Sequence, residues 1–174
     1  MILFVLPAAT IYDKQDRVMG WKSTPPSRDA MRELKHLVPR LRELGTTKII
    51  ACDLLSDSGK LLARRLNVPY EEWSSLRRFN VGRHHGAPAP KFNELYQKML
   101  AVWTEKPDVP VKGGDSLTSF NKRMSASADK LSKSANDDIV VVVADPLVVQ
   151  SLTKANGTLE RNRVYQWGPP SQTN

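Results

Sequence analysis

The sequence predicts an α/β fold, a single three-layer α/β/α sandwich whose central sheet is mainly parallel. Three short apolar runs rich in β-branched residues, at 2–6, 48–52 and 139–143, are typical of strands buried on both faces. Segments with the apolar spacing of helices lie between these runs, and this alternation implies parallel strands joined by right-handed crossovers. With 174 residues, 40% of them hydrophobic, the chain suits one domain. We place the domain at 1–168 and a flexible tail at 169–174.

The first predicted helix follows Ser27, which is placed to cap its N-terminus. Gly45 supplies the stop, because glycine readily adopts the left-handed conformation that ends many helices. Pro39 interrupts the pattern, so we expect a kink near Val38. The apolar positions that recur at three- and four-residue steps are Met31, Leu34, Leu37, Val38, Leu41 and Leu44.

The remaining elements follow in the same alternation. Helical spacing predicts helices over 58–66, 92–103 and 116–131, and another after Pro146, a residue that suits the first helical position. The last apolar stretch, at 164–167, is expected to add an edge strand.

Composition restricts the classes of function. The single cysteine, Cys52, excludes an intramolecular disulfide framework and a cysteine-based zinc cluster. No apolar run approaches the roughly 20 residues that cross a bilayer, and the start lacks signal-peptide features, so we expect a cytoplasmic protein without a membrane partner. A net charge of +8 favours anionic partners: an acidic protein first, with nucleic acid or a phosphorylated ligand as alternatives.

Several motifs occur in the order of a known family. The first apolar run ends in Leu6-Pro7-Ala8-Ala9, and residues 20–27 read Gly-Trp-Lys-Ser-Thr-Pro-Pro-Ser. This order resembles the histidine phosphatase (phosphoglycerate mutase-like) superfamily, in which a first strand ends in Leu/Val-Arg-His-Gly-Glu-Thr and a Gly-Trp-x-Asp-x-Pro-Leu-Ser segment follows. The resemblance continues in the segments 50–56, 76–82, 110–116 and 139–146. It therefore covers nearly the whole chain and implies the compact form of this fold, without a large cap insertion.

The same resemblance locates five positions at which the family's catalytic groups are replaced. Members of the family are similar in attacking phosphate with one histidine, in holding it with two arginines and a second histidine, and in protonating the leaving oxygen with an acid. Those positions are occupied here by Leu6, Pro7, Ser56, Arg78 and Asp145. Proline has no nucleophilic atom, arginine is no proton donor at neutral pH, and a carboxylate opposes a phosphate dianion. The replacements predict a catalytically inactive pseudoenzyme, with no catalytic residue, that serves as a binding, structural or assembly module, for example an accessory or virion protein.

A basic loop is the candidate contact surface. No acidic residue falls between positions 77 and 91, and a basic loop with an aromatic residue can bind phosphate groups or stack on a base. An alternative is a solvated loop whose arginines pair with carboxylates elsewhere. Adjacent histidines seldom point at one ion, so we expect no metal site and no cofactor. The candidate binding residues are Arg77, Arg78, Arg83, His84, His85 and Lys91.

Two other functions stay open. The first is an anion-binding or nucleic-acid-binding protein that uses the arginines of the basic loop and Lys91. The second is an enzyme acting on a phosphate ester with a rewired active site around Asp145, Arg78 and the two histidines. The family resemblance also makes a homodimer a reasonable expectation, although no residue of this sequence specifies it.

Overall fold

The computed structural model describes residues 1–135, 138–154 and 157–167, and the predicted tail at 169–174 lies outside these ranges. The strands form a five-stranded sheet in the order β3-β2-β4-β1-β5. All neighbouring strands are parallel except β5, which pairs antiparallel with β1 as an edge strand. The predicted α/β class and the predicted edge strand are both confirmed. The strands are β1 (Ile2–Val5), β2 (Lys48–Ala51), β3 (Tyr70–Glu72), β4 (Val140–Val143) and β5 (Val164–Trp167).

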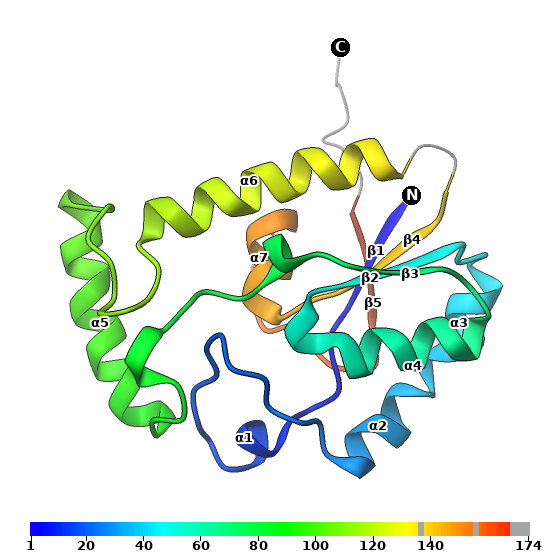
Figure 1. Cartoon of the computed structure of the whole chain (residues 1–174), viewed down its shortest axis with the longest axis horizontal. Coiled ribbons are helices and arrows are strands. Elements are labelled where there is room, and N and C mark those ends of the chain that lie inside the picture. The colour runs from blue at the N-terminus through cyan, green and yellow to red at the C-terminus, as the bar shows by residue number, and fades with distance from the viewer. Residues whose placement is uncertain (136–137, 155–156, 168–174) are drawn as a thin grey trace.

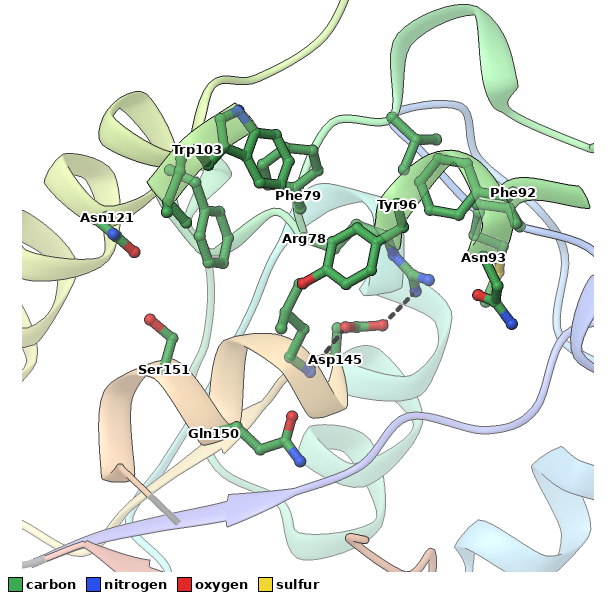
Figure 2. Close-up of a pocket in the computed structure, with 16 residues that line it drawn as sticks. Arg78, Phe79, Phe92, Asn93, Tyr96, Trp103, Asn121, Asp145, Gln150 and Ser151 are labelled. Atoms are coloured by element: carbon green, nitrogen blue, oxygen red, sulfur yellow. Dashed lines mark hydrogen bonds and ion pairs between the residues drawn. The ribbon is translucent and has the colours of Figure 1, made fainter. Parts of the chain in front are cut away.

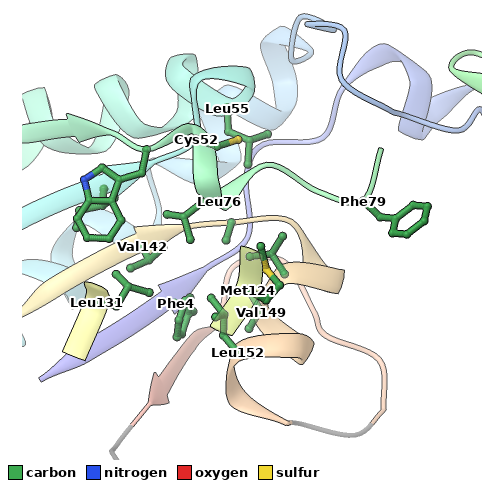
Figure 3. Close-up of a cluster of buried hydrophobic side chains, with 14 of the residues drawn as sticks. Phe4, Cys52, Leu55, Leu76, Phe79, Met124, Leu131, Val142, Val149 and Leu152 are labelled. Carbon is green, nitrogen blue, oxygen red and sulfur yellow. The ribbon is translucent and has the colours of Figure 1, made fainter. Parts of the chain in front are cut away.

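Helices cover both faces of this sheet, which confirms the three layers (Figure 1). Alternate strand residues point to opposite faces, so Phe4 joins the core under α6 and α7, whereas Val5 joins the core under α2, α3 and α4. Figure 3 shows the first of these two cores, in which Phe4 and Val142 of the sheet lie near Leu131 of α6 and Val149 of α7. The helices are α2 (Arg28–Leu34), α3 (Leu37–Glu43), α4 (Ser56–Leu66), α6 (Leu117–Ser134) and α7 (Pro146–Thr153).

The helix α5 (Ala89–Glu105) lies beyond the end of the sheet, on the side of the molecule opposite α3 (Figure 1). Within the described residues no large insertion interrupts the fold, as predicted. None of the helices in the described ranges is long and apolar enough to span a membrane.

The helix predicted after Ser27 is two helices, which corrects the expected kink at Val38. The chain breaks at Lys35 and His36, so that Pro39 falls in the first turn of α3. The backbone N–H groups of the first turn have no carbonyl partner within the helix, so the N–H that proline lacks costs no hydrogen bond there. Ser27 caps α2 as predicted, since its hydroxyl accepts a hydrogen bond from the backbone N–H of Ala30 at 3.2 Å.

Other element boundaries differ by a few residues. Helix α4 begins two residues before the predicted start, α5 begins at Ala89 and ends at Glu105, and α6 continues to Ser134. The sequence prediction missed the short helix α1 (Ile11–Lys14) and the strand β3. Strand β3 contains two glutamates and is partly exposed at the sheet edge, so it carries no apolar signal.

Two loops approach each other closely at Gly114. A Cβ atom at this position would lie 2.1 Å from the carbonyl oxygen of Asn80, which accepts a hydrogen bond from the Asp115 N–H at 2.9 Å. We therefore expect Gly114→Ala to lower the free energy of unfolding by about 1–3 kcal/mol, because the two backbones must separate. Urea unfolding measures this change, with Lys112→Ala as the control from an exposed position of the same loop. Equal unfolding midpoints for the two variants would contradict this packing.

Candidate active site

The loops that follow the carboxyl ends of β1 and β4 border a cavity of about 640 Å³ between the sheet and α5 (Figure 2). In parallel sheets such strand ends are the usual place for a ligand. Side chains of α5, α6 and α7 complete the walls of this cavity. Its charged residues are Arg78 and Asp145, and the other lining side chains of the described chain are apolar, aromatic or uncharged polar groups.

Arg78 and Asp145 form an ion pair on the wall of this cavity. The Nη2 atom of Arg78 lies 3.0 Å from Oδ2 of Asp145, and the two side chains are only 13% and 14% exposed. The other carboxylate oxygen of Asp145 accepts a hydrogen bond from the Leu147 N–H at 3.0 Å and thereby caps α7. The carboxylate is therefore held from two sides, and Figure 2 shows both contacts as dashed lines.

A second set of contacts fixes the backbone that carries Arg78. The indole N–H of Trp21 donates to the Arg78 carbonyl at 2.7 Å, and the Trp21 ring lies 4.9 Å from the guanidinium of Arg77 and 5.1 Å from that of Arg123. Arg123 also donates to the Arg77 carbonyl and pairs with Asp115 at 2.7 Å. Trp21 belongs to the Gly-Trp segment that resembles the family, but its contacts join segments far apart in the chain and could not be predicted from the sequence.

Arg77 turns away from the cavity and pairs with Asp53. Its Nε donates to Asp53 at 2.8 Å, and a further hydrogen bond joins the same two side chains. This pairing lowers the pKa of Asp53 and raises the pKa of Arg77. The guanidinium of Arg77 is thus paired with a carboxylate of the same chain. This agrees with the alternative in which arginines of the loop pair with carboxylates elsewhere.

A smaller cavity of about 280 Å³ adjoins the first one at the end of β1. Pro7, Asp13 and Arg161 line it together with Arg78 and Asp145. Arg161 donates from Nε to the Pro7 carbonyl at 3.2 Å and from Nη2 to Asp13 at 3.0 Å. The sequence analysis missed Arg161, which arrives from a loop far along the chain and has no neighbouring motif.

The five replaced positions do not all reach the site. Pro7, Arg78 and Asp145 meet around the smaller cavity. Leu6 is buried in the hydrophobic core, and Ser56 begins α4 without lining either cavity. The only cysteine, Cys52, is also buried, and burial raises its pKa to about 11, so it is a poor nucleophile.

The rest of the basic loop borders a third cavity, of about 650 Å³, beside α5. Arg83, His84, His85 and Lys91 line it, so the six predicted binding residues lie in three places, with Arg78 at the strand ends and Arg77 beside Asp53. The names larger cavity and smaller cavity are used below for the two adjoining cavities at the strand ends, of about 640 and 280 Å³. The Nδ1 atom of His85 accepts a hydrogen bond from the Gly20 N–H at 2.9 Å, which leaves the proton of the neutral ring on Nε2. A binding role for this loop stays a prediction.

Both loop histidines make stability depend on pH. Burial lowers the pKa of His84 and of His85, and nearby positive charges lower them further: Arg83 acts on His84, and Lys22 and Arg78 act on His85. The unfolded chain therefore takes up protons first, near pH 6.5, on acidification. The free energy of unfolding that the two neutral histidines contribute is fully present above about pH 6.5 and is lost as the pH falls below it.

We expect the wild type to lose unfolding free energy between pH 7.5 and pH 5, a range we set above the titration of the carboxylates. A double variant with His84→Gln and His85→Gln should lose less of it over the same range. Urea unfolding at a series of pH values measures both slopes, and values at pH 8, where unperturbed histidines are neutral, correct for other effects of the substitutions. Equal slopes would contradict the assignment.

The parallel sheet with an antiparallel edge strand, and a cavity at its strand ends, define a three-layer α/β protein with a ligand site at the strand ends. The family model described as "Histidine phosphatase superfamily (branch 1)" matches residues 7–172. The chain belongs to this superfamily, and the predicted family is confirmed.

Named relatives agree with this assignment. The chain is 25% identical over 133 residues to a "Probable phosphoglycerate mutase GpmB" of Yersinia pestis, a match that covers 74% of this chain and 61% of that protein. Among solved structures, a phosphoglycerate mutase from Bacillus anthracis matches with a TM-score of 0.79 at 19% identity, covering 95% of this chain and 87% of the other. A mycobacterial glucosyl-3-phosphoglycerate phosphatase complexed with VO3 matches with a TM-score of 0.76 at 18% identity, covering 94% and 88%.

These findings correct the prediction that the chain is not an enzyme. The family model is that of a phosphatase superfamily and the curated relative is named as a probable mutase, which points to enzyme activity. The prediction judged five positions by the needs of one mechanism. It could not take into account Arg161, or the fixed pairing of Arg78 with Asp145, because both depend on the folded arrangement.

Proposed function

We propose that this chain is a phosphatase that hydrolyses phosphate monoesters at the site built on Arg78 and Asp145. The ion pair between these two residues carries the proposal, because it brings a guanidinium and a carboxylate, both largely buried, together on the wall of a cavity at the strand ends, where parallel sheets usually bind their ligands. Membership of the histidine phosphatase superfamily supports the reaction class.

The charges of the site suit attack by water. Asp145 accepts a proton from a water molecule while the water oxygen forms a bond to phosphorus. The P–O bond of the ester breaks, its electron pair stays on the leaving oxygen, and that oxygen takes up a proton from solvent. Arg78 and Arg161 both line the smaller cavity and supply guanidinium groups for the phosphoryl oxygens, although each also pairs with a carboxylate, Arg78 with Asp145 and Arg161 with Asp13. The pairing of Arg78 with Asp145 also reduces the repulsion between the carboxylate and the phosphate.

Hydrolysis fits the site better than a mutase reaction. A mutase that passes the phosphoryl group through the protein needs a nucleophile to carry it, and Pro7 at the end of β1 offers none. The chain contains three histidines, His36, His84 and His85, and none of them lines the larger or the smaller cavity. Water is therefore the acceptor in this proposal.

Two assays on the purified chain test this function. Release of inorganic phosphate is measured with a panel of phosphate monoesters that includes 3-phosphoglycerate, and interconversion of 3- and 2-phosphoglycerate is measured in parallel. We expect phosphate release without interconversion. The proposal fails if no ester of the panel releases phosphate faster than it does without protein, or if interconversion is the faster reaction.

A further inference from the structure

The larger cavity has an aromatic wall that the proposed reaction does not use. Phe79 packs edge-to-face on Trp103 and on Phe120, with ring centroids 5.5 and 5.6 Å apart, and Tyr96 packs on Trp103 at 6.1 Å. Phe92 stacks on Tyr96 at 6.3 Å. All five rings line the cavity, so the wall is formed before any ligand enters (Figure 2).

The size of this cavity indicates how much of a ligand it holds. Its volume of about 640 Å³ falls in the range of sites that enclose a drug-sized molecule. Phe79, Trp103 and Phe120 are already buried, whereas Phe92 and Tyr96 are half-buried, so a three-carbon phosphate ester would leave these last two rings partly in contact with water. Burying the exposed parts of Phe92 and Tyr96 against a ligand is favourable in proportion to the apolar area removed from water.

We propose that the site takes small aromatic phosphate monoesters, with the ring system in the aromatic cavity and the phosphate at Arg78. This inference rests on the proposed function for the position of the phosphate group. The two cavities share five lining residues, among them Arg78 and Asp145, so an ester that spans them places its P–O bond beside the ion pair.

The chemistry of the leaving group favours the same class. Among the described residues no histidine or lysine lines the larger cavity, and its one carboxylate, Asp145, is assigned to accept a proton rather than to donate one. A phenol has a pKa of about 10, so its oxide leaves without prior protonation far more easily than an alkoxide does. An aromatic ester therefore depends less than an aliphatic one on a group that protonates its leaving oxygen.

Binding measurements test the ligand class without requiring turnover. Isothermal titration calorimetry compares 2-naphthyl phosphate, 2-naphthol and 3-phosphoglycerate on the full chain. We expect 2-naphthyl phosphate to bind at least about tenfold more tightly than either of the others, since it alone uses both ends of the site. Equal affinity of 2-naphthol would overturn the role of the phosphate, and equal affinity of 3-phosphoglycerate would overturn the role of the aromatic wall.

A blocking variant locates the binding site. Asn121 lies on an exposed position of α6 at the cavity, so Asn121→Trp fills the cavity without disturbing the core, and we expect it to weaken 2-naphthyl phosphate binding by at least about tenfold. Ser125→Trp adds the same side chain at an exposed position of α6 outside the cavity and should leave affinity unchanged. If the two variants bind the ester equally well, the ligand does not occupy this cavity.

Phosphate release in the same samples separates the two proposals. Tight binding of 2-naphthyl phosphate without its hydrolysis overturns the phosphatase function and retains the ligand class. Hydrolysis of 3-phosphoglycerate at the efficiency of 2-naphthyl phosphate retains the phosphatase and overturns the aromatic class. A tyrosine-phosphorylated peptide that binds more tightly than 2-naphthyl phosphate also overturns the proposal of a small-molecule ligand.

Discussion

An Asp145→Asn variant is expected to release phosphate from its ester substrate roughly 10²–10⁴-fold more slowly than the wild type. The amide can still accept the hydrogen bond from the Leu147 N–H that caps α7, and it has nearly the same volume. It cannot take a proton from the attacking water. It also leaves the Arg78 guanidinium without the carboxylate with which it is paired.

Steady-state rates at a temperature where both proteins remain folded measure this effect. Asp29→Asn makes the same substitution at an exposed carboxylate of α2 that pairs with Arg32, and it should retain the wild-type rate. We expect the loss in Asp145→Asn to appear in kcat, because the proton transfer occurs in the transition state. A wild-type kcat for Asp145→Asn would show that this carboxylate has no part in the reaction.

The largest effect on stability is expected for Arg123→Met. Asp115 is only 12% exposed, and loss of its arginine partner leaves a largely buried carboxylate without a counter-charge. Breaking a buried pair in this way costs about 3–5 kcal/mol. Arg123 also donates to the carbonyl of Arg77 and lies against Trp21, so the segment that carries Arg78 loses support.

Urea unfolding of Arg123→Met is compared with that of Arg40→Met, which breaks an exposed pair with Glu43. Exposed pairs contribute about 0–1 kcal/mol, so the control should stay near the wild type. Adding Asp115→Asn to Arg123→Met should restore part of the lost stability, because it removes the uncompensated charge. Similar free energies of unfolding for Arg123→Met and Arg40→Met would contradict the structural role of this pair.

The parts of the fold that could be predicted from the sequence are those with a local signal. The apolar runs of β1, β2 and β4 are buried on both faces, and Ser27 and Pro146 stand at helix starts, so pattern and position agree. Strand β3 escaped prediction because it is short, lies at the sheet edge without a buried residue, and has two glutamates among its three residues. The break at Lys35 and His36 escaped prediction because the apolar spacing continues across it, from Leu34 to Leu37.

The sequence predicted which segments contribute to the site, but not the contacts between their side chains. The family resemblance placed Arg78 and Asp145 at positions of the family's catalytic groups, and both residues line the cavities at the strand ends. Their pairing, the support from Trp21 and the entry of Arg161 depend on tertiary contacts between distant segments. The aromatic wall was not predicted because its five residues come from one loop and two helices, α5 and α6, that lie apart in the sequence.

A crystal structure with orthovanadate, which mimics the transferred phosphoryl group, tests the central claim most directly. The phosphatase proposal predicts vanadate in the smaller cavity, in contact with the guanidinium of Arg78 and near the carboxylate of Asp145. Vanadate bound instead at the cavity lined by Arg83 and Lys91, with the smaller cavity empty, would contradict it.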